Sequence, residues 1–214
     1  MSHVGNRSLS EEEKKMDIDN RAMMNELGGA FMVSWLVLAS TGLGMDTLEG
    51  ALVLAAAWMA ISGAHILPVV TWMHMMTGDL SDTDGMMANG LRLAMQAVGA
   101  ALALGLMTEF GTLENLPDWT ANAWEAPDAF GAMGMVAAGA VFWTVYSRCD
   151  AWVGAIAMMA LAGAMGGADA AHEMGACLLN SGAGLQDVAM HWIVDGLIVG
   201  VGALVGVKID EMAN

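Results

Sequence analysis

Long apolar runs separated by short polar breaks occupy most of this 214-residue chain. The runs suited to membrane-spanning helices cover residues 22–40, 47–62, 86–107, 129–147, 151–165 and 188–207. Most of them approach the roughly 20 residues that a helix needs to cross the hydrocarbon core. Two further runs, at about 67–77 and 169–180, are too short to cross, and each follows a turn that contains glycine. The pattern predicts an all-α membrane protein with six transmembrane helices and two re-entrant half-helices.

The two short runs occupy matching positions in two similar halves of the sequence. Leu67 and Asp169, which begin them, are 102 residues apart. The same separation relates Glu26 and Asp128, the acids near the start of the first and fourth spans. Three spans in each half would give the halves opposite orientations, so the short helices would enter from opposite faces and meet near the midplane. Because irregular backbone at this depth must be buried or line a watery cavity, we expect a permeation or binding site there.

Charged residues divide the chain into segments and indicate its orientation. The expected segments are a polar cytosolic tail, a first inverted repeat, an acidic extracellular loop, a second inverted repeat and a C-terminal tail, at residues 1–21, 22–107, 108–128, 129–208 and 209–214. With six spans and a cytosolic N-terminus, the cytosolic side receives all seven basic residues, namely Arg7, Lys14, Lys15, Arg21, Arg92, Arg148 and Lys208. This satisfies the positive-inside rule. We therefore expect a multi-pass protein of the cell (plasma) membrane with both termini in the cytosol.

The composition supports a membrane protein and excludes some partners. Hydrophobic residues make up 57% of the chain and charged residues only 14%, which is typical of an integral protein of the lipid bilayer. The net charge of −16 argues against nucleic acid or an anionic lipid surface as the main partner. Methionine and histidine at residues 73–76 suit Cu(I), but the 22 methionines are spread over every span and are better explained as packing residues. No metal or cofactor is expected.

Two segments resemble signatures of the aquaporin and aquaglyceroporin (major intrinsic protein) family. Residues 63–71, Gly-Ala-His-Ile-Leu-Pro-Val-Val-Thr, resemble the first signature of that family, Gly-Ala-His-x-Asn-Pro-Ala-Val-Thr. Residues 96–100 are similar to the Gln-x-x-Gly-Ala of its third helix, and Glu26 matches the buried glutamate of its first helix. The resemblance covers about residues 22–208. It implies a homotetrameric channel for water or small neutral solutes such as glycerol, in which Glu26 and His65 support the first short loop.

The chain departs from this family at the residues that would contact a solute. In the family, each turn carries an Asn-Pro-Ala triplet whose asparagine amide donates hydrogen bonds to the permeating molecule. The matching triplets here are Leu67-Pro68-Val69 and Asp169-Ala170-Ala171. Both asparagines are therefore replaced. The resemblance assigns the selectivity constriction to Thr47, Ala157, Gly166 and His172, the last of which replaces the selectivity arginine of the family.

These replacements change the expected chemistry of the pore in one direction. Leu67 can donate no hydrogen bond to a solute, so the midplane becomes drier on one side. Asp169 is a good N-cap and, if ionised, offsets the positive helix end that would exclude cations. Histidine has an unperturbed pKa of about 6.5 and is not always charged as an arginine is, so His172 is expected to weaken the barrier further. With small residues at Ala157 and Gly166, a wider outer constriction is expected.

Three functions are compatible with these residues. No nucleophile–base pair, phosphate loop or closed metal site occurs, so no enzyme and no catalytic residue are expected. The leading hypothesis is a passive channel for water or small uncharged solutes. The second is an atypical pore for cations or protons that uses Asp169 and His172, and the third is a non-conducting scaffold occluded at Leu67. In the last span, Asp195 lies one turn after His191, and the two are expected to form a structural ion pair or to help line a polar path.

Overall fold

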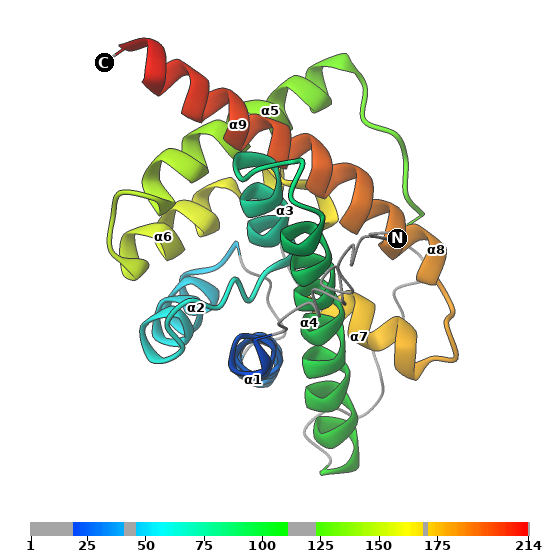
Figure 1. Cartoon of the computed structure of the whole chain (residues 1–214). Helices are drawn as coiled ribbons and strands as arrows, with labels where there is room; N and C mark the ends of the chain where they lie inside the picture. Colours follow the sequence, from blue (N-terminus) through cyan, green and yellow to red (C-terminus); the bar gives the residue numbers. More distant parts are fainter. Residues whose placement is uncertain (1–18, 41–45, 111–122, 169–170, 214) are drawn as a thin grey trace, which may run out of the picture.

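The computed structural model describes residues 19–40, 46–110, 123–168 and 171–213, which are helical throughout except for the connections (Figure 1). The first half contains α1 (Asn20–Ser40), α2 (Leu48–Ala60), α3 (Pro68–Thr77) and α4 (Thr83–Glu109). The second half contains α5 (Ala129–Tyr146), α6 (Ala151–Leu161), α7 (His172–Leu179), α8 (Leu185–Met190) and α9 (Gly196–Ala213). A π-helical turn, His191–Asp195, joins α8 to α9 without a break. The predicted all-α fold class is confirmed, with no strand in the described ranges.

Three helical segments in the described ranges are long and apolar enough to cross a membrane. They are Thr83–Glu109, Ala129–Tyr146 and the continuous stretch Leu185–Ala213. Two shorter apolar segments, Leu48–Ala60 and Ala151–Ala164, fall below that length. Helices of this kind support a membrane protein, as the composition predicted.

The observed helix ends differ from the predicted ones in the last and the fifth span. The last span, predicted at residues 188–207, belongs to a helical stretch that reaches Ala213, so the predicted C-terminal tail is helical over most of its length. The fifth span, predicted at 151–165, ends as an α-helix at Leu161 and continues as a 3₁₀ turn over Ala162–Ala164. The first 18 residues, most of the 108–128 loop, and Asp169 with Ala170 lie outside the described residues.

Local sequence signals explain where several helices begin. The Thr47 hydroxyl accepts a hydrogen bond from the Gly50 amide and caps α2. The Asp128 carboxylate accepts one from the Gly131 amide at 2.7 Å and caps α5. Pro68 occupies the first turn of α3, where its missing N–H has no helical partner to lose.

The packing scheme is unchanged when the two halves are interchanged. Within each half, the first helix packs against the last: α1 against α4, and α5 against α9. Between the halves, α2 packs against α6, and each short helix packs against the long helix of the other half, α3 on α9 and α7 on α4 (Figure 1). The 102-residue repeat in the sequence therefore has a counterpart in the contacts between helices.

Glycines permit the closest of these helix contacts. A methyl group on Gly99 of α4 would collide with the Leu27 carbonyl of α1, and one on Gly202 of α9 would collide with the Val136 carbonyl of α5. Only a residue without a side chain allows two backbones to approach this closely. The same role in equivalent helix pairs is further support for a structural repeat.

Candidate functional site

The turn before α3 is held by the buried carboxylate of Glu26. One carboxylate oxygen accepts a hydrogen bond from the His65 amide at 2.7 Å, and the other accepts one from the Ile66 amide at 2.8 Å. Ile66 has a φ of +68°, an uncommon conformation for a β-branched residue. Two hydrogen bonds to one fixed carboxylate hold the turn in this conformation. Two hydrogen bonds to the turn are what the expected supporting role of Glu26 requires.

Two side chains of α4 complete the surroundings of the Glu26 carboxylate. Arg92 donates to it at 2.6 Å and Gln96 at 2.8 Å, while Arg92 also donates to the Gly63 carbonyl at 3.2 Å. A buried charge is tolerated when it is paired and its oxygens are hydrogen-bonded. The sequence prediction did not assign Arg92 and Gln96 this role. Their four-residue spacing puts both on one face of α4, which is the signal that could have identified them.

His65 links the same turn to α2 and α3. Its carbonyl accepts a hydrogen bond from the Trp58 indole at 3.2 Å, and its Nδ1 lies 3.1 Å from the Thr71 hydroxyl. Its ring stacks on His74 of α3, with centroids 4.1 Å apart and planes 2° from parallel. His74 in turn meets the edge of Trp143, 4.9 Å away between centroids. His65 is therefore part of the turn's support, as expected, and also of an aromatic group.

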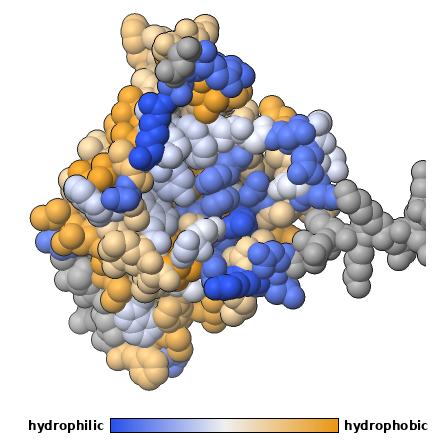
Figure 2. All heavy atoms as spheres, turned by 60° about the vertical axis from the view of Figure 1, so that its left-hand side comes forward, coloured by the Kyte–Doolittle hydropathy of each residue, from blue (hydrophilic) through white to orange (hydrophobic). Residues whose placement is uncertain are grey.

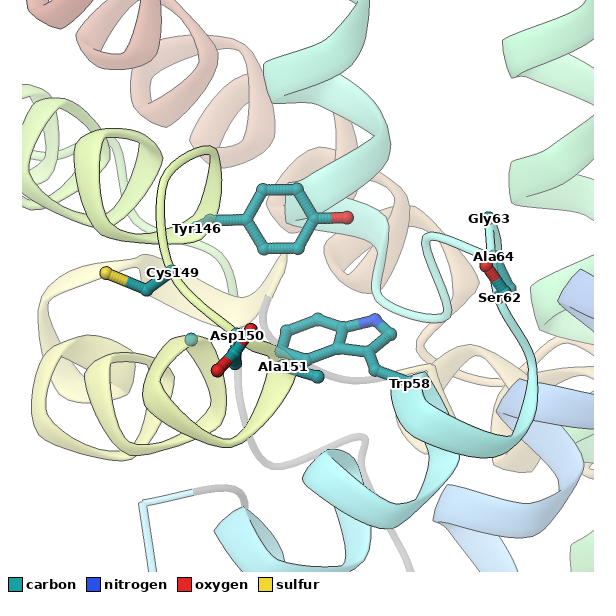
Figure 3. Close-up of a pocket in the computed structure, with 9 residues that line it drawn as sticks. Trp58, Ser62, Gly63, Ala64, Tyr146, Cys149, Asp150 and Ala151 are labelled. Carbon is teal, nitrogen blue, oxygen red and sulfur yellow. The ribbon is translucent and has the colours of Figure 1, made fainter.

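A cavity of about 200 Å³ lies beside this turn, between α2 and the connection from α5 to α6 (Figure 3). Trp58 and Tyr146 lie next to each other at its wall, with ring centroids 5.4 Å apart. In Figure 3 the Tyr146 hydroxyl points toward the chain around Gly63, and the Cys149 thiol points away from both aromatic rings. The cavity is large enough for several water molecules. Figure 2 shows hydrophilic residues gathered toward the middle of one face and apolar residues around its margin.

The start of α3 and the turn before α7 both have apolar surroundings. Leu67 is 1% exposed and Val69 is fully buried, and both belong to the same buried cluster as Ala168 of the second turn. Met158 of α6 and Met165, also fully buried, are part of this cluster. The start of α3 and the turn before α7 thus contribute buried side chains to the same apolar cluster.

The other predicted tip residues have different surroundings. Pro68 is buried at the start of α3. Ala171 lies in a second buried cluster, with Cys177 and Trp192. Asp169 and Ala170 lie outside the described residues, so the predicted cap at Asp169 stays a prediction.

The four predicted constriction residues have separate local roles. Thr47 caps α2, and Ala157 of α6 is half-buried against the cluster that contains Leu67. Gly166 is exposed with a φ of +66°, and His172 is half-buried at the start of α7. Of the four, Ala157 is the one that packs against the cluster to which Leu67 belongs.

The turn before α7 is held by a carboxylate from a different part of the fold. Asp195 accepts hydrogen bonds from the Gly167 amide and the Trp124 indole, each at 3.2 Å. It also lies 2.6 Å from Nδ1 of His191, so the expected pairing of these two residues is confirmed. Asp128, which the repeat relates to Glu26, is exposed and caps α5 instead. The two acids that the repeat relates therefore have different roles, because the carboxylate that holds the turn before α7 comes from the π-helical turn and not from the start of α5.

The fold and site together define an all-helical protein with membrane-type helices and two short helices that begin at carboxylate-anchored turns. No family model matches the chain, and no curated protein matches it. The resemblance to the aquaporin family therefore enters the function only as a proposal.

Proposed function

We propose that the protein is an aquaporin-like channel for passive permeation of water or small uncharged solutes such as glycerol. In this proposal α1, α2, α4, α5, α6 and the α8–α9 stretch are six spans, and α3 and α7 are re-entrant half-helices. The observation that carries the proposal is the exchanged packing of the short helices, α3 on α9 and α7 on α4. Two inverted repeats that interlock around a central path would produce this scheme.

The anchoring of both turns supports the same proposal. Backbone amides at membrane depth need internal partners, because lipid offers none. Glu26 supplies acceptors to the amides of His65 and Ile66, and Asp195 supplies one to the amide of Gly167. Irregular backbone satisfied in this way is what a re-entrant turn requires.

The apolar surroundings of Leu67 favour neutral solutes over ions. Leu67, Val69, Met158 and Met165 offer no group that could replace the hydration shell of an ion, and transfer of an ion into such surroundings is costly. The cation or proton alternative depends on Asp169, which lies outside the described residues, and on His172. The proposal includes homotetrameric assembly, which the resemblance implies. It also includes a plasma-membrane location with cytosolic termini, which the positions of the basic residues favour.

A second candidate, a non-conducting scaffold occluded at Leu67, is favoured by the burial of this side chain. Leu67 at 1% exposure fills the position where the family places a hydrogen-bond donor. A passive channel with this structure would have its narrowest point there. The two candidates differ in whether any neutral solute crosses, and in whether shortening Leu67 increases its flux.

Stopped-flow measurements on proteoliposomes test these candidates. The wild-type protein and the Leu67→Ala variant are compared under sucrose and glycerol gradients, with conductance recorded in parallel. Leu36→Ala, which shortens an exposed leucine of α1, is the matched control. Neutral flux without current, raised by Leu67→Ala and not by Leu36→Ala, supports the channel. Current carried by the wild type supports the ion pore, and no flux and no current in any variant support the scaffold.

A further inference from the structure

The imidazole ring of His191 packs against the turn before α7, and the predicted constriction did not include this residue. A methyl group on Gly167 would lie 2.7 Å from the His191 ring, and one on Gly166 would overlap the Asp195 carboxylate. The small side chain at Gly166 therefore does not by itself widen this turn, because Asp195 and His191 of the π-helical turn pack against Gly166 and Gly167.

The π-helical turn brings His191 and Asp195 to this position. The Gly196 amide donates to the His191 carbonyl five residues earlier, which is the π-helical pattern and is frequent at functional sites. Asp195 is 5% exposed at its side chain, whereas His191 is 22% exposed. The imidazole is thus partly exposed beside the turn before α7, while the carboxylate that it contacts is buried.

The hydrogen bonds around Asp195 determine which ring nitrogen of His191 can meet a solute. An ionised carboxylate only accepts hydrogen bonds, so the 2.6 Å contact makes Nδ1 of His191 the donor. Donors from Trp124 and Gly167 hold the same carboxylate in place. In the neutral ring, Nε2 then carries a lone pair on the opposite edge, and it is an acceptor.

We propose that His191 is a selectivity-determining residue at the outer end of the permeation path, where its Nε2 accepts a hydrogen bond from the permeating solute. Asp195 is the positioning residue that fixes the ring and its tautomer. The inference rests on the proposed channel function and specifies its solutes: neutral molecules that donate hydrogen bonds, such as water and polyols. An acceptor at this point replaces the donor that a selectivity arginine would supply.

The test is the ratio of glycerol to water permeability in proteoliposomes. In His191→Phe, which keeps a planar ring and removes both nitrogens, we expect the glycerol permeability to fall by about 2- to 10-fold, the effect of one hydrogen bond. The ratio falls with it, because a water molecule keeps hydrogen bonds to neighbouring waters in the path. His191→Gln, whose amide oxygen can accept, should retain more of the wild-type ratio. Ile193→Ala, at an exposed position of the same turn, is the matched control and should leave the ratio unchanged.

Asp195→Asn tests the positioning role separately. The ¹⁵N chemical shifts of the His191 ring should show loss of the Nδ1-protonated form, and the permeability ratio should move toward that of His191→Phe. If the tautomer changes and the ratio of the folded protein stays that of the wild type, the positioning role is contradicted.

Three outcomes overturn the inference, and they are distinguishable. If the wild type conducts neutral solutes and monodisperse His191→Phe and His191→Ala keep its ratio, the role of His191 is wrong and the channel proposal stands. If neither the wild type nor Leu67→Ala conducts any neutral solute, the channel proposal fails and this inference fails with it. If His191→Phe does not fold, the ratios of His191→Gln and His191→Ala decide, and equal ratios overturn the inference.

Discussion

The two turns that begin the short helices differ in where their supporting carboxylate comes from. In the first, Glu26 reaches the turn from α1, at the start of its own half, and bonds to Arg92 and Gln96 of α4. In the second, Asp195 reaches the turn from the end of its half and bonds to His191 and Trp124. The helix packing follows the repeat, but the anchors do not. Two halves can therefore keep one architecture while their polar chemistry diverges.

The first turn is held by more backbone hydrogen bonds to its carboxylate than the second. Glu26 accepts from two backbone amides and from a guanidinium, and is fully buried. Asp195 accepts from one backbone amide of its turn and interacts with an imidazole that is partly exposed. We infer that the first turn is the rigid one and that the second is better suited to contact a solute.

The largest expected effect is the loss of the Glu26 carboxylate. Glu26→Ala leaves two buried amides and the Arg92 guanidinium without their acceptor, and breaking a buried ion pair costs about 3–5 kcal/mol. Asp128→Ala, at the position that the repeat relates to Glu26, removes only a helix cap worth about 1 kcal/mol. The two variants are compared by thermal unfolding in detergent, in which the fraction of monodisperse protein is measured as the temperature rises. Equal destabilisation would contradict the different roles assigned to these acids.

A smaller effect is expected where backbones touch in the two equivalent helix pairs. Gly99→Ala in α4 and Gly202→Ala in α9 each push a methyl group into a carbonyl of the facing helix, and overpacking of this kind costs about 1–3 kcal/mol. The two variants should be similarly destabilised, because the pairs α1–α4 and α5–α9 are packed alike.

Gly134→Ala provides the control for these two variants. Gly134 is an exposed helical residue of α5 with open space around it, so the change should leave the protein as stable or slightly more stable, because alanine favours the helix. If Gly99→Ala and Gly202→Ala were as harmless as Gly134→Ala in the same unfolding assay, the close contact of the helix pairs would be wrong.

The helices were predictable from the sequence because apolar periodicity and length determine them locally. The run at residues 129–147 corresponds to Ala129–Tyr146, and the short run at about 67–77 corresponds to Pro68–Thr77. The Thr47 cap of α2 and the proline in the first turn of α3, Pro68, act within one turn of the chain, so residues of these types are visible in the sequence.

The anchors were only partly predictable, because they depend on how helices are rotated against each other. Glu26 could be identified from the resemblance. Asp195 was expected to pair with His191 but not to hold the second turn, because that contact needs the π-helical turn, which no apolar pattern specifies. The small residue at position 166 led us to expect a wide outer constriction. The π-helical turn places the Asp195 carboxylate against Gly166, so a small residue there does not by itself widen the path.

The smallest expected effect concerns Trp124, which the described structure connects to Asp195 across 71 positions of sequence. Trp124→Phe keeps an aromatic ring and removes the indole N–H, so it should destabilise the protein by about 1 kcal/mol, the net value of one hydrogen bond. A double-mutant cycle with Asp195→Asn should give a coupling energy of similar size, because both changes act on the same bond.

The pair Glu26 and Trp124 shares no hydrogen bond, and the cycle of Trp124→Phe with Glu26→Gln should be additive. Coupling to Glu26 as strong as to Asp195 would mean that the two turns are not held independently. The contrast between a first turn anchored by α1 and a second anchored by the π-helical turn would then lose its basis.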